Sequence, residues 1–115
     1  MQPREIARAA AEALSEKKAI NIRVLEVTDL TVMADFFVIA SGTSPPHLRT
    51  LADEVEHCLE KLEVAPAHKE GHNSGNWLLL DYSSVVIHVF SQDTRDFYAI
   101  ERLWADSKYW EPENL

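Results

Sequence analysis

The chain has 115 residues, 46% of them hydrophobic, which is enough apolar material for one domain-sized hydrophobic core. Eleven Lys and Arg residues against nineteen Asp and Glu residues give a net charge of −8, which disfavours direct nucleic-acid readout and favours a basic protein as partner. A single cysteine, Cys58, excludes an intrachain disulfide framework and a multi-thiolate metal site.

The first part of the chain predicts a helix followed by two strands. Apolar residues recur on one helical face from Pro3 to Lys18. The β-branched segment from Ile20 to Val27 predicts a strand, and the uninterrupted apolar run from Phe36 to Ala40 predicts a central strand covered on both faces. The start of the chain has no secretion-leader pattern, and no apolar run approaches the roughly 20 residues that cross a membrane. We therefore expect a cytoplasmic protein with no membrane contact.

A second helix is expected after Ser44, a good N-cap that is followed by Pro45 at the first helical position. Its apolar stripe comprises Leu48, Leu51, Ala52, Val55, Leu59 and Leu62. Cys58 lies close to this stripe, and we interpret it as a core or boundary residue and not as a reactive thiol. A short edge strand is expected near residues 67–70.

The end of the chain predicts a third helix, capped by Asp93 or Thr94. It carries the apolar residues Phe97, Ile100, Leu103 and Trp104. Tyr98 and Trp104 point in different directions on such a helix, so Trp104 is the better core residue and Tyr98 the better contact residue. Residues 111–115 are expected to fray, which leaves residues 1–110 as a single domain.

Two apolar runs, Trp77 to Tyr82 and Val85 to Phe90, flank the pair Ser83-Ser84 and predict a β-hairpin. A two-residue loop sets the register. One side of the hairpin then carries the pairs Tyr82–Val85, Leu80–Ile87 and Leu78–Val89, and the other carries Asp81–Val86, Leu79–His88 and Trp77–Phe90. The first side is almost wholly aliphatic and should face the core, because it has no polar atom that needs a partner.

The second side of the hairpin combines aromatic anchors with one carboxylate and one imidazole, which is typical of a binding surface. The candidate partner-binding residues are Trp77, Leu79, Asp81, His88, Phe90 and, from the third helix, Tyr98. The alternative is that the first or third helix covers this side and that Asp81 and His88 pair internally. The order of the elements indicates an α/β (α+β) fold with a mixed sheet of four or five strands and helices.

Three segments resemble the Iojap family, whose members are also called ribosomal silencing factors. They are Gly75 to Phe90, which contains the hairpin, Asp35 to Ser44, and Arg95 to Trp104. Together they span nearly the whole chain. The sequence departs from the family pattern at the hairpin tip, where Ser83-Ser84 replaces the usual Gly-Asp, and after Ser44, where Pro45-Pro46 replaces a basic residue before His47.

The resemblance implies a sheet of nucleotidyltransferase-like topology and a function on the large ribosomal subunit. Family members bind the large-subunit ribosomal protein numbered fourteen and sterically block joining of the small subunit, which represses translation when nutrients are scarce. The resemblance therefore implies a binding factor with no catalytic residues and no cofactor. An acidic factor that binds a basic ribosomal protein agrees with the charge of this chain.

Three alternatives remain open at this stage. Ser41 to Ser44 lies between a strand and a helix, where backbone N–H groups can bind phosphate, so a degenerate or active nucleotidyltransferase is the runner-up function. A metal site is a weaker alternative, because the histidines lack the spacing of a zinc site and the nearest pair is His68 and His72. The second side of the hairpin could also mediate a homodimer.

Overall fold

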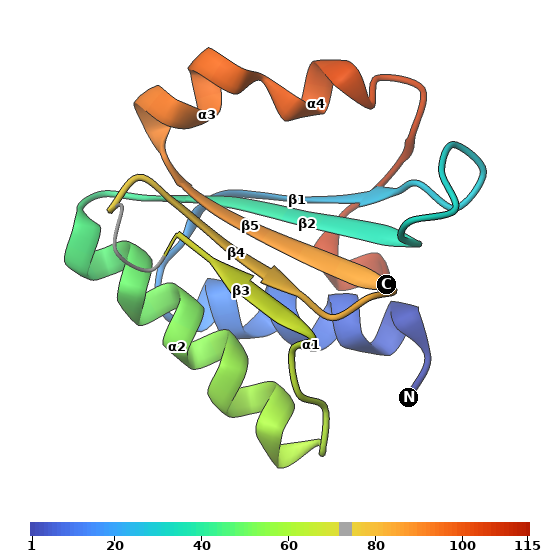
Figure 1. The fold of residues 1–115 in the computed structure, drawn as a ribbon, viewed down its shortest axis with the longest axis horizontal. Coiled ribbons are helices and arrows are strands. Elements are labelled where there is room, and N and C mark those ends of the chain that lie inside the picture. Colours follow the sequence, from blue (N-terminus) through green and yellow to red (C-terminus); the bar gives the residue numbers. More distant parts are fainter. Residues whose placement is uncertain (72–74) are drawn as a thin grey trace.

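Helices and strands are interspersed along residues 1–71 and 75–115, which this computed structural model describes (Figure 1). In chain order the elements are α1 (Pro3–Glu16), β1 (Ile20–Glu26), β2 (Phe36–Gly42), α2 (Pro45–Lys61), β3 (His68–Glu70), β4 (Trp77–Asp81), β5 (Val85–Ser91), α3 (Gln92–Tyr98), α4 (Ile100–Leu103), β6 (Lys108–Trp110) and the 3-10 helix η1 (Pro112–Asn114). The mixed α/β class predicted from the sequence is confirmed.

Within the described ranges, the strands form one 6-stranded sheet in the order β3-β4-β5-β2-β1-β6. The central pair, β2 and β5, is parallel, and every other neighbouring pair is antiparallel. The sheet therefore has more strands than the expected four or five, because β6 adds to the outer edge of β1. With 3 residues, β6 is too short for alternation of side chains to indicate a strand.

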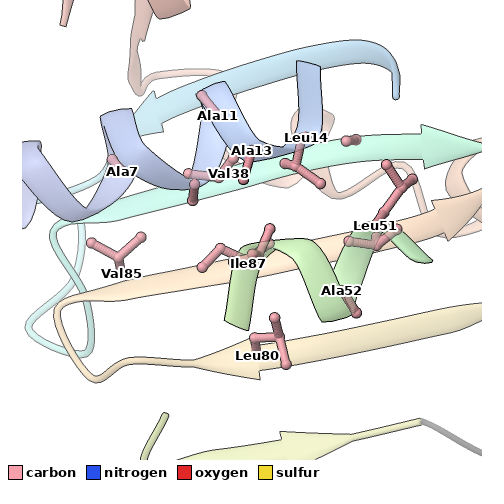
Figure 2. Close-up of a cluster of buried hydrophobic side chains, with 14 of the residues drawn as sticks. Ala7, Ala11, Ala13, Leu14, Val38, Leu51, Ala52, Leu80, Val85 and Ile87 are labelled. Carbon is pink, nitrogen blue, oxygen red and sulfur yellow. The ribbon is translucent and has the colours of Figure 1, made fainter. Parts of the chain in front are cut away.

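The main core lies between one face of the sheet and the two long helices, α1 and α2 (Figures 1 and 2). Alanines on α1, among them Ala7 and Ala11, are fully buried, and their small side chains let this helix approach the sheet closely. Leu80 and Ile87 face the same core from the hairpin, as Figure 2 shows. The prediction that the aliphatic side of the hairpin faces the core is confirmed.

The start of α2 follows the expected N-cap. The side chain of Ser44 accepts a hydrogen bond of 3.2 Å from the backbone N–H of His47, and Pro45 occupies the first turn. Cys58 is half-buried against the core, as expected for a boundary residue. Leu62 was wrongly assigned to the buried stripe: it follows the last residue of α2 as the C-cap and is exposed.

The third expected helix is two helices. Ser91, and not Asp93 or Thr94, caps α3, because its hydroxyl accepts a hydrogen bond of 3.3 Å from the backbone N–H of Thr94. Ala99 then adopts a left-handed conformation with φ 47° and ψ 48°, which separates α3 from α4. The break changes the rotational phase of the helix, so two residues expected on one apolar face become exposed, Phe97 at 81% and Leu103 at 78%.

The last residues, for which the sequence suggested a frayed tail, contain a short helix. Residues Pro112–Asn114 form η1, which lies against α1, and Leu115 packs against the main core. Just before them, the indole Nε1 of Trp110 donates a hydrogen bond of 2.8 Å to the carboxylate of Glu26. These contacts hold the end of the chain on the sheet. None of the described helices is both long and apolar enough to span a membrane.

Candidate functional site

The hairpin has the register predicted from its two-residue loop. Trp77 pairs with Phe90, Leu79 with His88, and Asp81 with Val86. The backbone N–H of Tyr82 donates to the carbonyl of Val85, which closes the loop. We call the side of the hairpin that faces away from α1 and α2 its outer face. Because the register is as predicted, the candidate side chains of β4 and β5 share this outer face.

The outer face is covered over β5 and open over β4. His88 is 6% exposed and Phe90 is 1% exposed, because α3 and α4 follow β5 and fold back over it (Figure 1). Trp77, Leu79 and Asp81 on β4 stay half-buried. The expectation of an exposed side is therefore wrong for His88 and Phe90, which lie beneath the helices that the sequence suggested as an alternative cover.

The covered residues form part of an aromatic cluster, which comprises Phe37, Trp77, His88, Phe90, Tyr98 and Trp104. The ring of Trp77 lies at its centre, with centroids 4.7 Å from Phe90 and 4.9 Å from Tyr98. Phe37 contributes from the central strand and packs edge-on against Trp104 at 5.1 Å. Rings at these distances stabilise one another and hold their neighbours in fixed orientations.

A hydrogen bond fixes the orientation of Trp77. Its indole Nε1 donates to Nδ1 of His88 over 3.2 Å, so the proton of the neutral imidazole lies on Nε2. Among the described residues, Nε2 of His88 has no hydrogen-bond partner and is buried. Burial lowers the pKa of His88 to about 4, and the nearby charge of Asp81 only partly opposes this effect. His88 is therefore neutral near pH 7.

Asp81 does not pair with His88. Its carboxylate accepts a hydrogen bond of 2.7 Å from the backbone N–H of Ser83, whose φ of 70° is in the left-handed region. The bond holds the hairpin loop and leaves the charge of Asp81 near the surface. The internal Asp81–His88 pair considered from the sequence is thus replaced by two separate contacts, Asp81 to the loop and His88 to Trp77.

Two cavities adjoin the aromatic cluster. One, of about 480 Å³, lies between the hairpin and α3 and is lined by Trp77, Leu79, Tyr98 and four more polar or small residues, Glu70, Gly71, Asn76 and Thr94. The other, of about 280 Å³, is almost wholly apolar and is lined by Phe37, Trp77, His88, Tyr98, Ile100, Leu103 and Trp104. Trp77 and Tyr98 line both cavities, so the two cavities adjoin each other at these residues.

Exposed apolar side chains extend this surface. Tyr98 is 51% exposed, and Phe97 and Leu103 are more exposed still. We define the docking face as Trp77, Leu79, Phe97, Tyr98 and Leu103. The sequence identified Trp77, Leu79 and Tyr98, and it missed Phe97 and Leu103 because an unbroken helix would bury them. Aromatic and aliphatic side chains that converge around shallow cavities can hold the side chains of a protein partner.

The features that suggested catalysis or a metal have structural roles. The backbone N–H of Thr43 donates 2.9 Å to Nδ1 of His47, so it is not free to bind phosphate. A Cβ at Gly42 would lie 2.6 Å from Leu48, which shows that this turn is packed and not open. His68 pairs with Glu70, and His72 lies outside the described residues. The described part of the chain contains no group of three or more potential metal ligands.

A family model described as "Ribosomal silencing factor during starvation" matches residues 1–115. A ribosomal silencing factor of Halalkalibacterium halodurans is 31% identical over 115 residues, which are 100% of this chain and 98% of the relative. A mouse protein named "Mitochondrial assembly of ribosomal large subunit protein 1" is 35% identical over 94 residues, which are 79% of this chain and 41% of the relative. A crystal structure of a Chromobacterium violaceum protein is similar with a TM-score of 0.89 at 37% identity, covering 91% of this chain and 88% of that one.

Proposed function

The chain belongs to the ribosomal silencing factor family, and from this premise we propose that it binds the large ribosomal subunit and sterically blocks joining of the small subunit. The contact on the large subunit is the ribosomal protein numbered fourteen, and the effect is repression of translation under poor nutrient conditions. The family description supports a role in starvation, and the name of the mouse relative refers to the large subunit. Such a factor acts in the cytoplasm, where bacterial ribosomes are found.

The docking face is the observation that carries this proposal. Trp77 and Leu79 are half-buried and adjoin the exposed apolar side chains of Phe97, Tyr98 and Leu103. Exposed apolar patches of this kind mark binding sites. His88 and Phe90 do not touch the partner in this arrangement: they support Trp77 from beneath. An interface of ordinary size, about 800 Å² on each partner, can rest on a few such anchors.

The charge of the surrounding surface determines what kind of protein fits. Asp81 lies on the same outer face, and Glu70 lines the larger cavity. The whole chain carries a net charge of −8. A partner that is basic around an apolar centre complements both features, and the attraction falls as salt screens it. A basic ribosomal protein meets these requirements.

Sedimentation of the protein with separated ribosomal subunits tests the proposal. We expect it to travel with the large subunit only, to be released as salt is raised, and to prevent the two subunits from forming whole ribosomes. Crosslinking from the docking face should then identify the ribosomal protein that it touches. Travel with the small subunit, or normal subunit joining when the large subunit is saturated, would contradict the proposal.

Self-association is the competing use of the same surface, because a second copy could cover the docking face in a two-fold dimer. The acidic residues around the face oppose this use, since they would repel their own copies. Light scattering of wild-type protein and of a Trp77→Ala variant separates the two. A dimer that dissociates in the variant together with loss of ribosome binding would indicate that both use one surface.

A further inference from the structure

A third cavity lies on the other side of α3 from the docking face. It has a volume of about 420 Å³ and is lined by Asn21, Arg23, Gln92, Arg95, Asp96, Ala99, Glu101 and Arg102. None of these residues lines the two cavities of the docking face. Three arginines around one cavity are notable in a chain with 11 basic and 19 acidic residues. The cavity therefore concentrates positive charge on an otherwise negative molecule.

Internal contacts use the two carboxylates of this cavity and leave two arginines available. Glu101 binds Arg95 with both oxygens, at 2.9 Å and 3.2 Å, and Asp96 accepts a hydrogen bond of 2.8 Å from the amide of Gln92. Arg23 and Arg102 form no ion pair with any described residue. A ligand in the cavity would therefore meet these two positive charges together with the carboxylate of Asp96, which the neutral amide of Gln92 does not neutralise.

Arg95 forms a rigid floor of the cavity. It is only 6% exposed, and its Nη1 donates 2.9 Å to the hydroxyl of Ser41, at the end of β2. Together with the two bonds to Glu101, this contact fixes the guanidinium between the sheet and α4. Because this side chain is already fixed, little conformational entropy is lost when a ligand binds against it.

The position in the fold also favours a ligand. The parallel strands β2 and β5 both end here, and after β2 the chain passes to α2 on one face of the sheet, whereas after β5 it passes to α3 on the other (Figure 1). Open α/β sheets bind ligands in the crevice at the carboxyl ends of neighbouring strands whose connections diverge in this way. An irregularity in β1 next to Ser41, with Asn21 at φ 51°, places Asn21 and Arg23 at the same crevice.

We propose that this cavity binds a compact phosphate-bearing ligand, with Arg23 and Arg102 contacting the phosphate and Arg95 forming the floor of the cavity. Guanidinium groups bind phosphate oxygens through charge-assisted and often bidentate hydrogen bonds. A compact ligand with one or two phosphates needs only these local cations. A long polyanion such as RNA would also approach the acidic remainder of the surface and be repelled by it.

Titration calorimetry and amide NMR with inorganic phosphate and with pyrophosphate test this proposal. We compare the wild-type chain with Arg23→Gln/Arg102→Gln, and with Arg8→Gln/Lys61→Gln as a control that removes the same charge from α1 and α2. We expect saturable binding, tighter for pyrophosphate, with shifts at Asn21 and Ala99. The cavity variant should weaken binding at least about tenfold, whereas the control should change it little.

Three results would overturn the proposal: no binding up to about 10 mM pyrophosphate, equal weakening by the control variant, or binding of single-stranded RNA but of neither phosphate nor pyrophosphate. Thermal unfolding of both variants shows whether they are folded. The cavity variant changes no residue of the docking face, so its binding to the large subunit should be retained. Failure of the phosphate site can thus be told apart from failure of the proposed ribosomal function.

Discussion

The indole N–H of Trp77 donates to the imidazole of His88 across the hairpin, so a buried residue of β5 orients a half-exposed residue of β4. The two side chains were both proposed from the sequence as direct contacts. In the structure they have different roles: Trp77 offers its ring to the surface, and His88 holds that ring in place. An anchor that is oriented before binding loses little entropy when a partner docks.

Replacing Trp77 should therefore weaken binding beyond what its loss of stability explains. We expect Trp77→Ala to weaken large-subunit binding by about 2 kcal/mol or more, roughly thirtyfold, as for a central aromatic anchor. Trp110→Ala is the matched control, because it removes an indole that is also half-buried and hydrogen-bonded, but on β6 at the far edge of the sheet. Quantitative co-sedimentation checks both. Equal loss of binding in the two variants would place the anchor elsewhere.

The buried imidazole of His88 makes stability depend on pH. Its pKa is about 4 in the folded chain and about 6.5 when unfolded, so between these values the unfolded chain binds more protons. The stabilisation is complete above pH 6.5 and is lost as the pH falls through 4, with a total of about 3 kcal/mol. Urea unfolding from pH 7 to 4 measures it. His88→Gln should remove this part of the pH dependence, and an unchanged slope would contradict it.

The hairpin loop contains removable strain. Ser83 has φ 70°, a conformation that costs a residue with a Cβ about 1 kcal/mol and glycine almost nothing. Glycine relieves this strain, but it also gives the unfolded chain more entropy, which offsets part of the gain. We therefore expect Ser83→Gly to raise the free energy of unfolding by only about 0.5 kcal/mol. Ser84→Gly, at a residue without positive φ, should lower it instead. Chemical denaturation of the two variants gives the comparison, and the reverse order would disprove the strain.

The ion pair of Arg95 and Glu101 should hold α4 on the sheet, because it links α3 to α4 across the break at Ala99. We expect Arg95→Gln to destabilise the fold by about 2 kcal/mol, less than for a fully buried pair because Glu101 keeps part of its exposure to water. In a double-mutant cycle, Glu101→Gln should cost less once Arg95 is replaced. Additive effects of the two substitutions would show that the pair does not couple the helices.

Local sequence patterns predicted the hairpin fully, whereas the features that depend on long-range packing could not be predicted. Alternation along Trp77 to Asp81 and a two-residue loop determine the register, whatever the rest of the chain does. The break at Ala99 has no such signal, because alanine favours a continuous helix and no glycine marks the left-handed turn. The break at this one residue exposes Phe97 and Leu103, which the sequence did not indicate.

The cover over β5 could not be predicted for a related reason. Whether His88 and Phe90 are exposed depends on where α3 packs, and only the tertiary contacts of β2 and β5 determine this. Phe37 was missed because it belongs to an apolar run without alternation, which hides the face that each residue occupies. Its signal was the strand itself: a central strand has two covered faces, and one of them carries the aromatic cluster.

Phe97 gives the sharpest test of the docking face, because it is 81% exposed and its loss should leave the core intact. We expect Phe97→Ser to change the free energy of unfolding by less than about 0.5 kcal/mol, as for most surface substitutions. Its ring packs edge-on against Tyr98 at 5.1 Å, beside both cavities. Large-subunit binding should therefore weaken about tenfold, since a partner seated there loses apolar contact area.

The matched control for Phe97 is Val32→Ser, which removes another exposed apolar side chain, in the loop between β1 and β2. That loop lies outside the docking face, so the variant should bind the large subunit as the wild type does. Co-sedimentation at several salt concentrations checks both variants. If Val32→Ser weakens binding and Phe97→Ser does not, the partner contacts the β1–β2 loop, because the stability of neither variant can account for the difference.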